Sequence, residues 1–570
     1  MKRKRGAGIL LPITSLPSRY GIGTMGKEAY AFADFLKKAG QTYWQILPVG
    51  PTSYGDSPYQ SFSTFAGNPY LIDLETLIEE GLLTQKDCDK AGLEPYRDKS
   101  VSDAAGRKRK AEDIETGKTA KAAKTKAAAE AAGKSETKKE NSSGKKMYPA
   151  TGIGANDPMY VDYALQYTHR YPLLKLAYAN FLKQKKEQEK SYRDFLKKQA
   201  GWLPDYALFM ALKDENGGVP FTEWEMPIRL RKRKALADAK KRLEKEVGFY
   251  EFLQYKFSEQ WTRLKCYINS IGLRIIGDIP IYVAADSADV WANPELFQLD
   301  DQCIPKAVAG VPPDYFSATG QLWGNPLYDW PAHEETNFSW WISRMRHCYE
   351  LYDMVRIDHF RGFDEYYAVP YGHKTAELGV WEPGPGLRLF DAIKKELGPR
   401  DVIAEDLGFM TKSVERMVKK SGFPNMKIVL FGFSPEGDSE YLLHNHERNC
   451  VVYTGTHDND TAVGYYKRAS RREKAFARDY LGIKNGRDFA LGAIRSALSS
   501  VADTAVIPMQ DYLQLGNEAR LNMPATLGGI NWQWRLLPGQ YSDKLADKIR
   551  RMCFVYARCD DKNLADGSAM

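Results

Sequence analysis

Three acidic residues of this 570-residue chain each stand at or near the end of a short apolar run. Asp358 closes MVRID, Glu405 lies near the end of DVIAED, and Asp458 closes VVYTGTHD. An ionised side chain at the tip of a buried strand is costly unless it has a partner or a task. Two carboxyls about 5 to 5.5 Å apart can cleave a glycosidic bond with retention, one as nucleophile and the other as proton donor and later base. The acids therefore predict chemistry on a sugar acetal.

The spacing of neighbouring residues suggests a role for two of these acids. Arg356 and Asp358 lie two apart on a predicted strand, so both side chains point to one face, where the guanidinium holds the carboxylate ionised as a nucleophile. Glu405, at the end of the following strand, is then the acid that protonates the leaving oxygen. Asp406 beside it is an alternative on spacing alone.

The remaining polar residues at these positions have two readings each. Asp458, preceded by His457, could grip sugar hydroxyls as the ring flattens in the transition state. An Asp beside Arg or His is more often part of a structural ion-pair network, but three such acids at three strand ends favour catalysis. Asp278 in GDIPIYV could simply order a turn, and His359 and His457 could be core histidines, although their adjacency to the acids favours sugar contact.

The elements that must position these residues are eight short runs, most of them separated by segments with helical periodicity. Near-continuous apolar strands alternating with helices predict an α/β fold, a (β/α)8 TIM barrel, whose catalytic residues lie at the carboxyl ends of the strands. Asp278, Asp358, Glu405, Asp458 and Asp511 all fall there. The runs span residues 8–12, 43–49, 274–281, 354–358, 401–406, 426–432, 451–458 and 504–511.

The chain is longer than the roughly 250 residues of a bare barrel, and the surplus is localised. We expect residues 1–80 and 271–536 to form the barrel and residues 81–270 to form a helical insertion subdomain. Residues 537–570 are expected to form a C-terminal helical extension, because PGQYSDKLADKIRRMCFVYAR is amphipathic.

The segment 96–147 differs in kind from the rest of the insertion. It has no Leu, Phe or Trp and is rich in Lys and Ala, so it predicts a disordered insert. It holds 15 Lys and Arg against 8 Asp and Glu, which accounts for most of the formal net charge of +8. The remainder is close to neutral, so a nucleic-acid-binding face is not expected there. Contact of the basic segment itself with nucleic acid or an acidic surface is an alternative to a solvated linker.

Other classes of protein find little support in the sequence. The seven cysteines form no CxxC pair and are expected to be reduced thiols. The basic N-terminus leads into an apolar run too short for a signal peptide, and no run approaches the roughly 18 apolar residues of a membrane span, so we expect a cytoplasmic protein. No phosphate loop, HExxH or zinc-type Cys/His spacing occurs, so no metal or cofactor is expected.

Longer motifs around these residues make the chain resemble the amylomaltases, the 4-α-glucanotransferases of glycoside hydrolase family 77. The resemblance covers roughly residues 7–75, 155–215 and 250–535, while the Lys/Ala-rich insert and the C-terminal extension depart from the pattern. The motifs are SYGDSPYQSFSTFAGNPYLIDL, GDIPIYVAADSADVWANPELF, GVPPDYFSATGQLWGNPLYDW, RIDHFRGF, VIAEDLG, GTHDNDT and NWQWR.

The resemblance implies a role for each matching residue. It makes Asp358 the nucleophile, Glu405 the general acid/base and Asp458 the transition-state stabiliser, in a barrel with inserted helices and without metal or organic cofactor. It also implies two groups of substrate-binding residues: Tyr59, Asp278, Arg356, His359 and His457 lining the site, and Asp314, Gln321 and Trp323 on a mobile loop over the acceptor subsites.

The expected reaction is transfer of α-1,4-glucan segments between maltooligosaccharides, glucose, starch or glycogen chains, by a monomer. A held acceptor sugar and exclusion of water would favour transfer over hydrolysis, and aromatic stretches such as DYFSATGQLWGNPLYDW offer flat faces to sugar rings. The alternatives are an α-glucan hydrolase of the amylase type, which shares the three acids, and a catalytically silent glucan-binding protein.

Overall fold

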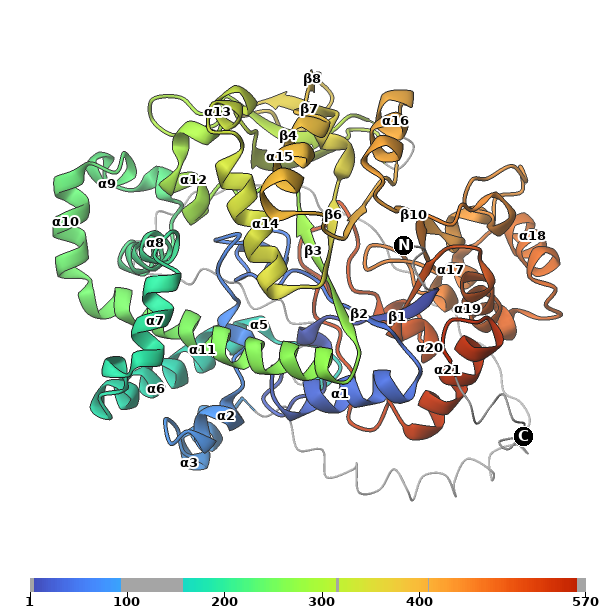
Figure 1. Cartoon of the computed structure of the whole chain (residues 1–570), viewed down its shortest axis with the longest axis horizontal. Helices are drawn as coiled ribbons and strands as arrows, with labels where there is room; N and C mark the ends of the chain where they lie inside the picture. Colours follow the sequence, from blue (N-terminus) through green and yellow to red (C-terminus); the bar gives the residue numbers. More distant parts are fainter. Residues whose placement is uncertain (1–4, 94–156, 314–316, 409, 561–570) are drawn as a thin grey trace, which may run out of the picture.

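Eight parallel strands form a nearly closed barrel in the computed structural model, which describes residues 5–93, 157–313, 317–408 and 410–560 (Figure 1). The strands pair in the order β10-β11-β12-β1-β2-β3-β6-β9, and the Ala404 amide reaches the Pro424 carbonyl at 3.0 Å between β9 and β10. Each of the eight predicted runs overlaps one of these strands, so the predicted barrel is confirmed. The strands are β1 (Gly6–Leu10), β2 (Tyr43–Gln45), β3 (Arg274–Pro280), β6 (Met354–Asp358), β9 (Val402–Ala404), β10 (Asn425–Ile428), β11 (Cys450–Tyr453) and β12 (Thr504–Pro508).

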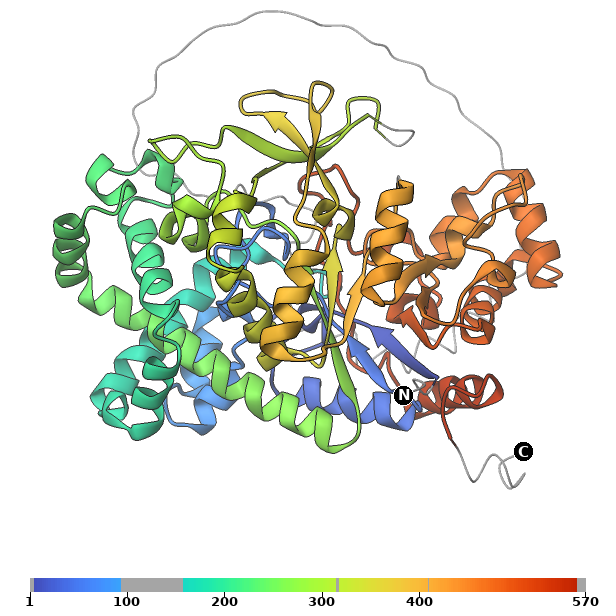
Figure 2. The same ribbon diagram turned by 45° about the horizontal axis from the view of Figure 1, so that its top comes forward.

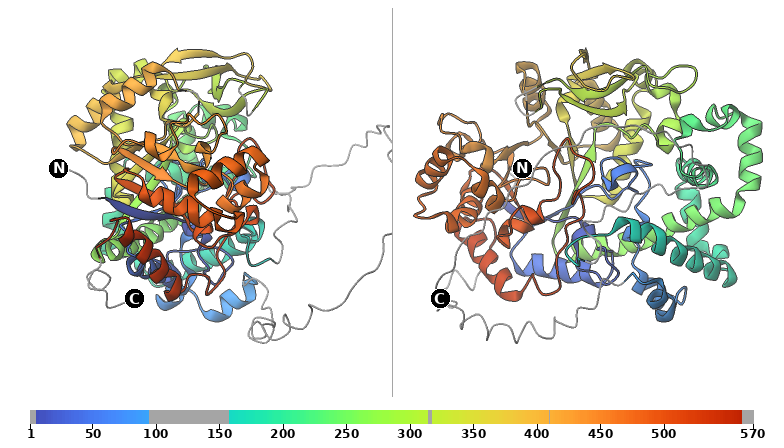
Figure 3. Two further views of the ribbon diagram at one scale, coloured as in Figure 1. Left: turned by 90° about the vertical axis from the view of Figure 1, so that its right-hand side faces the viewer. Right: turned by 180° about the vertical axis from the view of Figure 1, so that it is seen from behind.

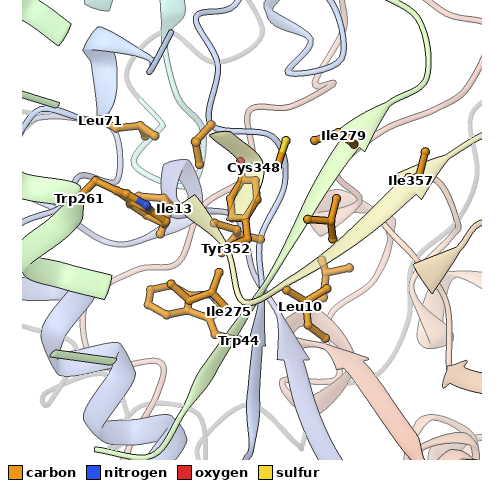
Figure 4. Packing of buried hydrophobic residues seen from close by; sticks show 14 of the residues in the cluster. Leu10, Ile13, Trp44, Leu71, Trp261, Ile275, Ile279, Cys348, Tyr352 and Ile357 are labelled. Atoms are coloured by element: carbon orange, nitrogen blue, oxygen red, sulfur yellow. The ribbon is translucent and has the colours of Figure 1, made fainter. Parts of the chain in front are cut away.

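The barrel core is made of the apolar side chains that define these runs. Trp44, Ile275 and Tyr352 belong to one buried cluster with Leu10 and Ile357 (Figure 4). Both faces of the strands are covered, as expected of an all-parallel sheet, and this is why the runs are almost continuously apolar. Polar residues therefore collect where the strands end.

The helices between the strands pack around the outside of the barrel. Two of them form within segments whose sequence shows helical periodicity. They are α1 (Lys27–Lys38) after β1 and α15 (Leu387–Leu397) after β6. Helix α16 (Lys412–Ser421) begins after Thr411, whose side chain caps it, and is followed by Gly422, whose φ of 72° suits glycine. The others around the barrel are α12 (Ala288–Ala292), α13 (Trp330–Glu335), α14 (Ser339–Leu351), α16 (Lys412–Ser421), α17 (Ala462–Arg468), α18 (Arg471–Leu481), α19 (Phe489–Ser499) and α20 (Met509–Tyr512).

Most of the helices that the structure describes between β2 and β3 stand to one side of the barrel, opposite α17, α18 and α19 (Figure 3). The long helix α11 (Glu244–Ser270) packs against α8 (Leu203–Glu215) and leads into β3. The division into domains stays a prediction, and the segment 96–147 lies outside the described residues. The remaining helices are α2 (Leu74–Glu79), α3 (Gln85–Ala91), α5 (Tyr163–Leu165), α6 (Tyr171–Lys183), α7 (Lys190–Lys198), α9 (Met226–Arg229) and α10 (Arg233–Arg242).

A second sheet, which the sequence analysis does not predict, lies beyond the carboxyl ends of β3 and β6 (Figure 2). It is antiparallel, in the order β5-β4-β7-β8, and part of it is half-buried or exposed. Its strands come from the two segments that follow β3 and β6, so it extends the end of the barrel where the predicted site residues lie. They are β4 (Ala307–Val311), β5 (Gln321–Pro326), β7 (Glu365–Pro370) and β8 (Val380–Pro383).

Near the C-terminal end, helix α21 (Asp543–Val555) packs on α1. Tyr541, just before it, makes an edge-on contact with Phe32 at 5.5 Å between ring centroids. The buried guanidinium of Arg558 donates to the carbonyls of Gly6 and Leu498, which ties this segment to β1 and α19. No helix in the described ranges is long and apolar enough to cross a membrane.

Candidate active site

The candidate site is organised by a buried guanidinium between two carboxylates. In the parallel register of β3 and β6, Asp278 lies opposite Arg356. Arg356 Nη1 donates to both oxygens of Asp278, at 2.9 and 2.8 Å, and Nη2 lies 2.9 Å from Asp358 Oδ1. The Tyr59 hydroxyl donates to the same Asp278 at 3.0 Å. Asp278 therefore binds site side chains instead of simply ordering a turn.

The Glu405 side chain is fixed from the backbone. The chain leaves β6 through His359, whose φ of 56° turns the main chain so that its amide donates to Glu405 Oε2 at 2.7 Å. The Leu407 amide donates to Oε1 at 2.8 Å. Two amide donors hold this carboxyl in one orientation.

Glu405 and the neighbouring Asp358 lie in different electrostatic environments. Burial, and then the charge of Asp358, raise the pKa of Glu405 to about 8, against the opposing effects of Arg356 and the two amides. Burial also raises the pKa of Asp358, whereas Arg356 opposes it. Asp358 has the guanidinium at 2.9 Å, and Glu405 has no ion-pair partner among the described residues. The proton shared by this pair therefore resides on Glu405 at neutral pH.

Two further acids at strand ends bind backbone and side-chain groups of neighbouring elements and so have structural roles. Asp406 accepts the Met426 amide at 2.9 Å, so it faces β10 and not the Glu405 side. Asp511 is buried and accepts the Thr454 hydroxyl and the Ala462 amide at the start of α17. Of the two acids that spacing leaves open, the geometry favours Glu405.

The third acid, Asp458, is held ionised by a different set of contacts. His457 Nε2 lies 3.2 Å from its Oδ2, and the Asn522 side-chain amide donates to its Oδ1 at 2.6 Å. Burial alone would raise the pKa of Asp458, but His457, Asn522 and Arg356 together lower it to about 2. With 36 % of its side chain exposed, this carboxylate is still accessible. It is an oriented negative charge throughout the neutral range.

Aromatic rings stand beside these carboxyls. Tyr59 stacks on His457 with centroids 5.1 Å apart, and Trp532 packs against both rings at 5.7 and 5.9 Å. On the other side, Trp323 on β5 meets His359 edge-on at 4.7 Å. Flat apolar faces with polar edges suit sugar rings.

The structure places most of the predicted substrate-binding residues together. Gln321 and Trp323 lie on β5, where the indole N–H of Trp323 donates to the Gln321 side chain at 3.2 Å. They lie on a strand of the second sheet, whereas the resemblance implied a mobile loop over the acceptor subsites. Asp314 lies outside the described residues. Within the described part of the chain, no group of three or more His, Cys, Asp or Glu side chains could hold a metal ion.

Sequence reasoning assigned no site role to Asn522 or Trp532. The Asn522 side chain binds Asp458 directly, and its backbone amide donates to the His457 carbonyl at 3.0 Å. Trp532 packs against the stacked rings of Tyr59 and His457. Both lie in an irregular segment, LNMPATLGGINW, without strand or helix periodicity. The only available signal was the NWQWR motif itself, which contains Trp532.

Comparison with known proteins agrees with this geometry. The family described as 4-alpha-glucanotransferase, glycoside hydrolase family 77, matches residues 11–540. A 4-alpha-glucanotransferase of Clostridium butyricum is 44 % identical over 550 residues, covering 96 % of this chain and 100 % of that protein. One of Thermus thermophilus is 43 % identical and covers 97 % and 99 %.

A solved structure extends the likeness to three dimensions. The amylomaltase from Streptococcus agalactiae, in complex with acarbose, is 38 % identical with a TM-score of 0.84, covering 98 % of this chain and 100 % of that one. With sequence and fold both matched over almost their whole length, the chain belongs to the 4-alpha-glucanotransferases of glycoside hydrolase family 77.

Proposed function

We propose that Asp358, Glu405 and Asp458 carry out the glucan transfer of this family by a retaining double displacement. The observation that carries the proposal is the contrast between two neighbouring carboxyls. Asp358 is paired with Arg356 at 2.9 Å, whereas Glu405 is buried on backbone amides with its pKa raised to about 8. One nucleophile and one proton donor at neutral pH are what the first step requires.

In the first step, an oxygen of Asp358 bonds to the anomeric carbon of the donor glucan as the bond from that carbon to the leaving oxygen breaks. Glu405 gives its proton to the leaving oxygen, which departs as the 4-hydroxyl of the released chain. Asp458, ionised and held by His457 and Asn522, stabilises the positive charge that develops on the sugar ring.

In the second step, the 4-hydroxyl of an acceptor glucan attacks the same carbon. Glu405 takes the hydroxyl proton, the bond to Asp358 breaks, and the new α-1,4 bond forms with the original configuration. The two aromatic groups, Tyr59 with His457 and Trp532, and Trp323 with His359, support binding of sugar rings beside the carboxyls. A bound acceptor has a large effective concentration relative to water.

We propose maltooligosaccharides, starch and glycogen chains as donors, and these and glucose as acceptors. A monomer in the cytoplasm is the expected setting. The seven cysteines are all free thiols, five of them buried, which suits a reducing compartment. Sedimentation of the purified protein would test the oligomeric state.

The direct test is incubation of the protein with maltotriose as the only sugar, following product lengths, glucose and total reducing ends. Glucose together with a ladder of longer maltooligosaccharides, at constant reducing ends, is the expected result. Rising reducing ends without longer products would instead indicate a hydrolase. An inert protein whose Asp358→Asn variant binds sugar equally well would indicate a glucan-binding protein.

A further inference from the structure

Two chain segments meet beside Asp458, and one largely buried side chain, that of Arg520, bonds to both. The first segment is the turn GTHDNDT after β11, which carries Asp458. The second follows the short helical turn η12 (Asn517–Ala519) and carries Arg520 and Asn522, two residues apart, with the buried Leu521 between them. Arg520 is therefore placed to fix how the two segments lie against each other.

The Arg520 guanidinium makes three contacts in three directions. Nη2 donates to the Asp458 carbonyl at 2.6 Å, and Nε donates to the Asn522 carbonyl at 2.6 Å. Nη1 pairs with the carboxylate of Asp460, which lies two residues after Asp458 in the same turn. Because the guanidinium is planar and its donors have fixed directions, these contacts set the positions of all three partners at once.

Asp460 balances the charge of Arg520 and is itself held in place. The side chains of Arg520 and Asp460 are only 12 % and 10 % exposed. The Asn517 side-chain amide donates to Asp460 at 2.9 Å, and the exposed Arg468 pairs with it at 3.2 Å. A buried ion pair contributes little net stability, so its presence here is better explained by the geometry that it imposes.

We propose that Arg520 is a positioning residue for the charge that stabilises the transition state, acting on Asp458 by two routes. One is direct, through the Asp458 carbonyl. The other passes through Asn522, whose side-chain amide donates to Asp458 Oδ1 at 2.6 Å. A fixed charge stabilises a transition state only where it is oriented before the reaction, and a displacement of about 1 Å can cost about 10²-fold in rate. The proposal rests on the role of Asp458 in the proposed function.

A lysine in place of Arg520 would keep the positive charge and lose the geometry. Its ammonium group can still pair with Asp460, but it has no planar fork to reach both carbonyls as well. Arg520→Lys is therefore the principal variant. Arg468→Lys is the matched control, because it makes the same exchange at an exposed arginine that pairs with the same carboxylate.

The assay measures kcat and KM for consumption of maltotriose, after melting temperatures have shown that each variant is folded. Arg520→Lys is expected to lower kcat about tenfold or more and to change KM less than about twofold, because Asp458 acts in the transition state. Turnover of α-maltosyl fluoride should fall by the same factor, since the ring becomes positive with either leaving group. Arg468→Lys should keep the parental kcat within about twofold.

A second measurement separates positioning from general support of the fold. In an Asn522→Ala background one of the two routes is already lost, so Arg520→Lys should lower kcat by about threefold or less, whereas independent losses would multiply. Asp460→Asn leaves Arg520 in place without its counter-charge, and it should lower kcat severalfold at unchanged KM. This variant decides the question if Arg520→Lys does not fold.

Parental kcat in folded Arg520→Lys, or a loss that multiplies fully with that of Asn522→Ala, would overturn the role of Arg520. Parental kcat in Asp460→Asn would overturn it if Arg520→Lys does not fold. Failure of the proposed function looks different. Consumption of maltotriose without longer products would refute transfer, while the same kcat values would still decide the role of Arg520. An unsubstituted protein that turns over neither donor would refute both.

Discussion

Transfer from a maltooligosaccharide donor should depend on one proton, which Glu405 carries. A change of pH tests this dependence, because burial and the charge of Asp358 raise the pKa of the Glu405 carboxyl to about 8. The acid acts only in its protonated form, so activity should fall as pH rises through this value. Below it, Glu405 stays protonated, and activity should hold until Asp358, the other member of the pair, takes up a proton and loses its charge.

The size of the effect follows from the titration of a single group. With a pKa of about 8, Glu405 is about 90 % protonated at pH 7, half at pH 8 and about 10 % at pH 9. With the ordinary Glu pKa near 4.3, only about 0.2 % would be protonated at pH 7, several hundredfold less. The descending limb of kcat/KM therefore distinguishes a buried acid from an ordinary one, although its midpoint belongs to the coupled pair.

The assay measures kcat/KM for the donor from pH 5 to 10, in parallel with maltotriose and with α-maltosyl fluoride. Fluoride leaves without needing a proton, so the limb near pH 8 should be present with maltotriose and absent with the fluoride. A limb at the same pH with both donors would refute the assignment of the proton to the leaving group. A limb near pH 5 with maltotriose would refute the electrostatic reasoning.

Four substitutions test the site and the packing of the strands beneath it. Glu405→Gln should lower the rate of maltotriose transfer about 10²- to 10⁴-fold and the turnover of α-maltosyl fluoride much less. Asp406→Asn can still accept the Met426 amide, so it should keep the transfer rate within about one order of magnitude. Comparable losses in both would indicate that the acid is misassigned. Asn522→Ala removes a hydrogen bond to a charged group, worth about 1.5–3 kcal/mol, so kcat/KM should fall by about one to two orders of magnitude with Asp458 still ionised at pH 7. Unchanged kcat/KM would mean that His457 alone positions Asp458. Gly277→Ala places a methyl group 2.2 Å from the Tyr352 ring, and urea titration should show a loss of about 1–3 kcal/mol of unfolding free energy, whereas unaltered stability would mean that the ring moves freely.

The barrel could be predicted from the sequence because its strands are buried on both faces. Runs such as MVRID and TAVIP are mostly apolar and buried along almost their whole length, and a polar residue then marks the position where the strand leaves the core. That transition identified Asp358, Glu405 and Asp458. It could not separate Glu405 from Asp406, because adjacent residues at a strand end point in opposite directions and only the Met426 amide shows which way Asp406 faces.

The second sheet and the support of Asp458 could not be predicted for two physical reasons. Strands β5 and β8 carry partly exposed residues, so their local pattern is weak, and the two hairpins β4–β5 and β7–β8 join into one sheet only through β4 and β7, which are far apart in the chain. Asn522 and Trp532 reach the site from irregular chain, and Trp532 adopts a φ of 66°, which no sequence periodicity indicates. Only tertiary structure brings such residues to a site.

The two hydrogen bonds from Arg356 to Asp278 have a consequence for the covalent stage of the proposed cycle. Once Asp358 has become an ester, it carries no charge and no longer balances the guanidinium. A lone buried cation at that moment would be costly and would repel the developing positive sugar ring. Because Asp278 holds Arg356 through two hydrogen bonds of 2.9 and 2.8 Å, the guanidinium keeps a counter-ion while the nucleophile is occupied. Asp278 thus lets Asp358 alternate between a free carboxylate and an ester without leaving the buried Arg356 guanidinium unpaired.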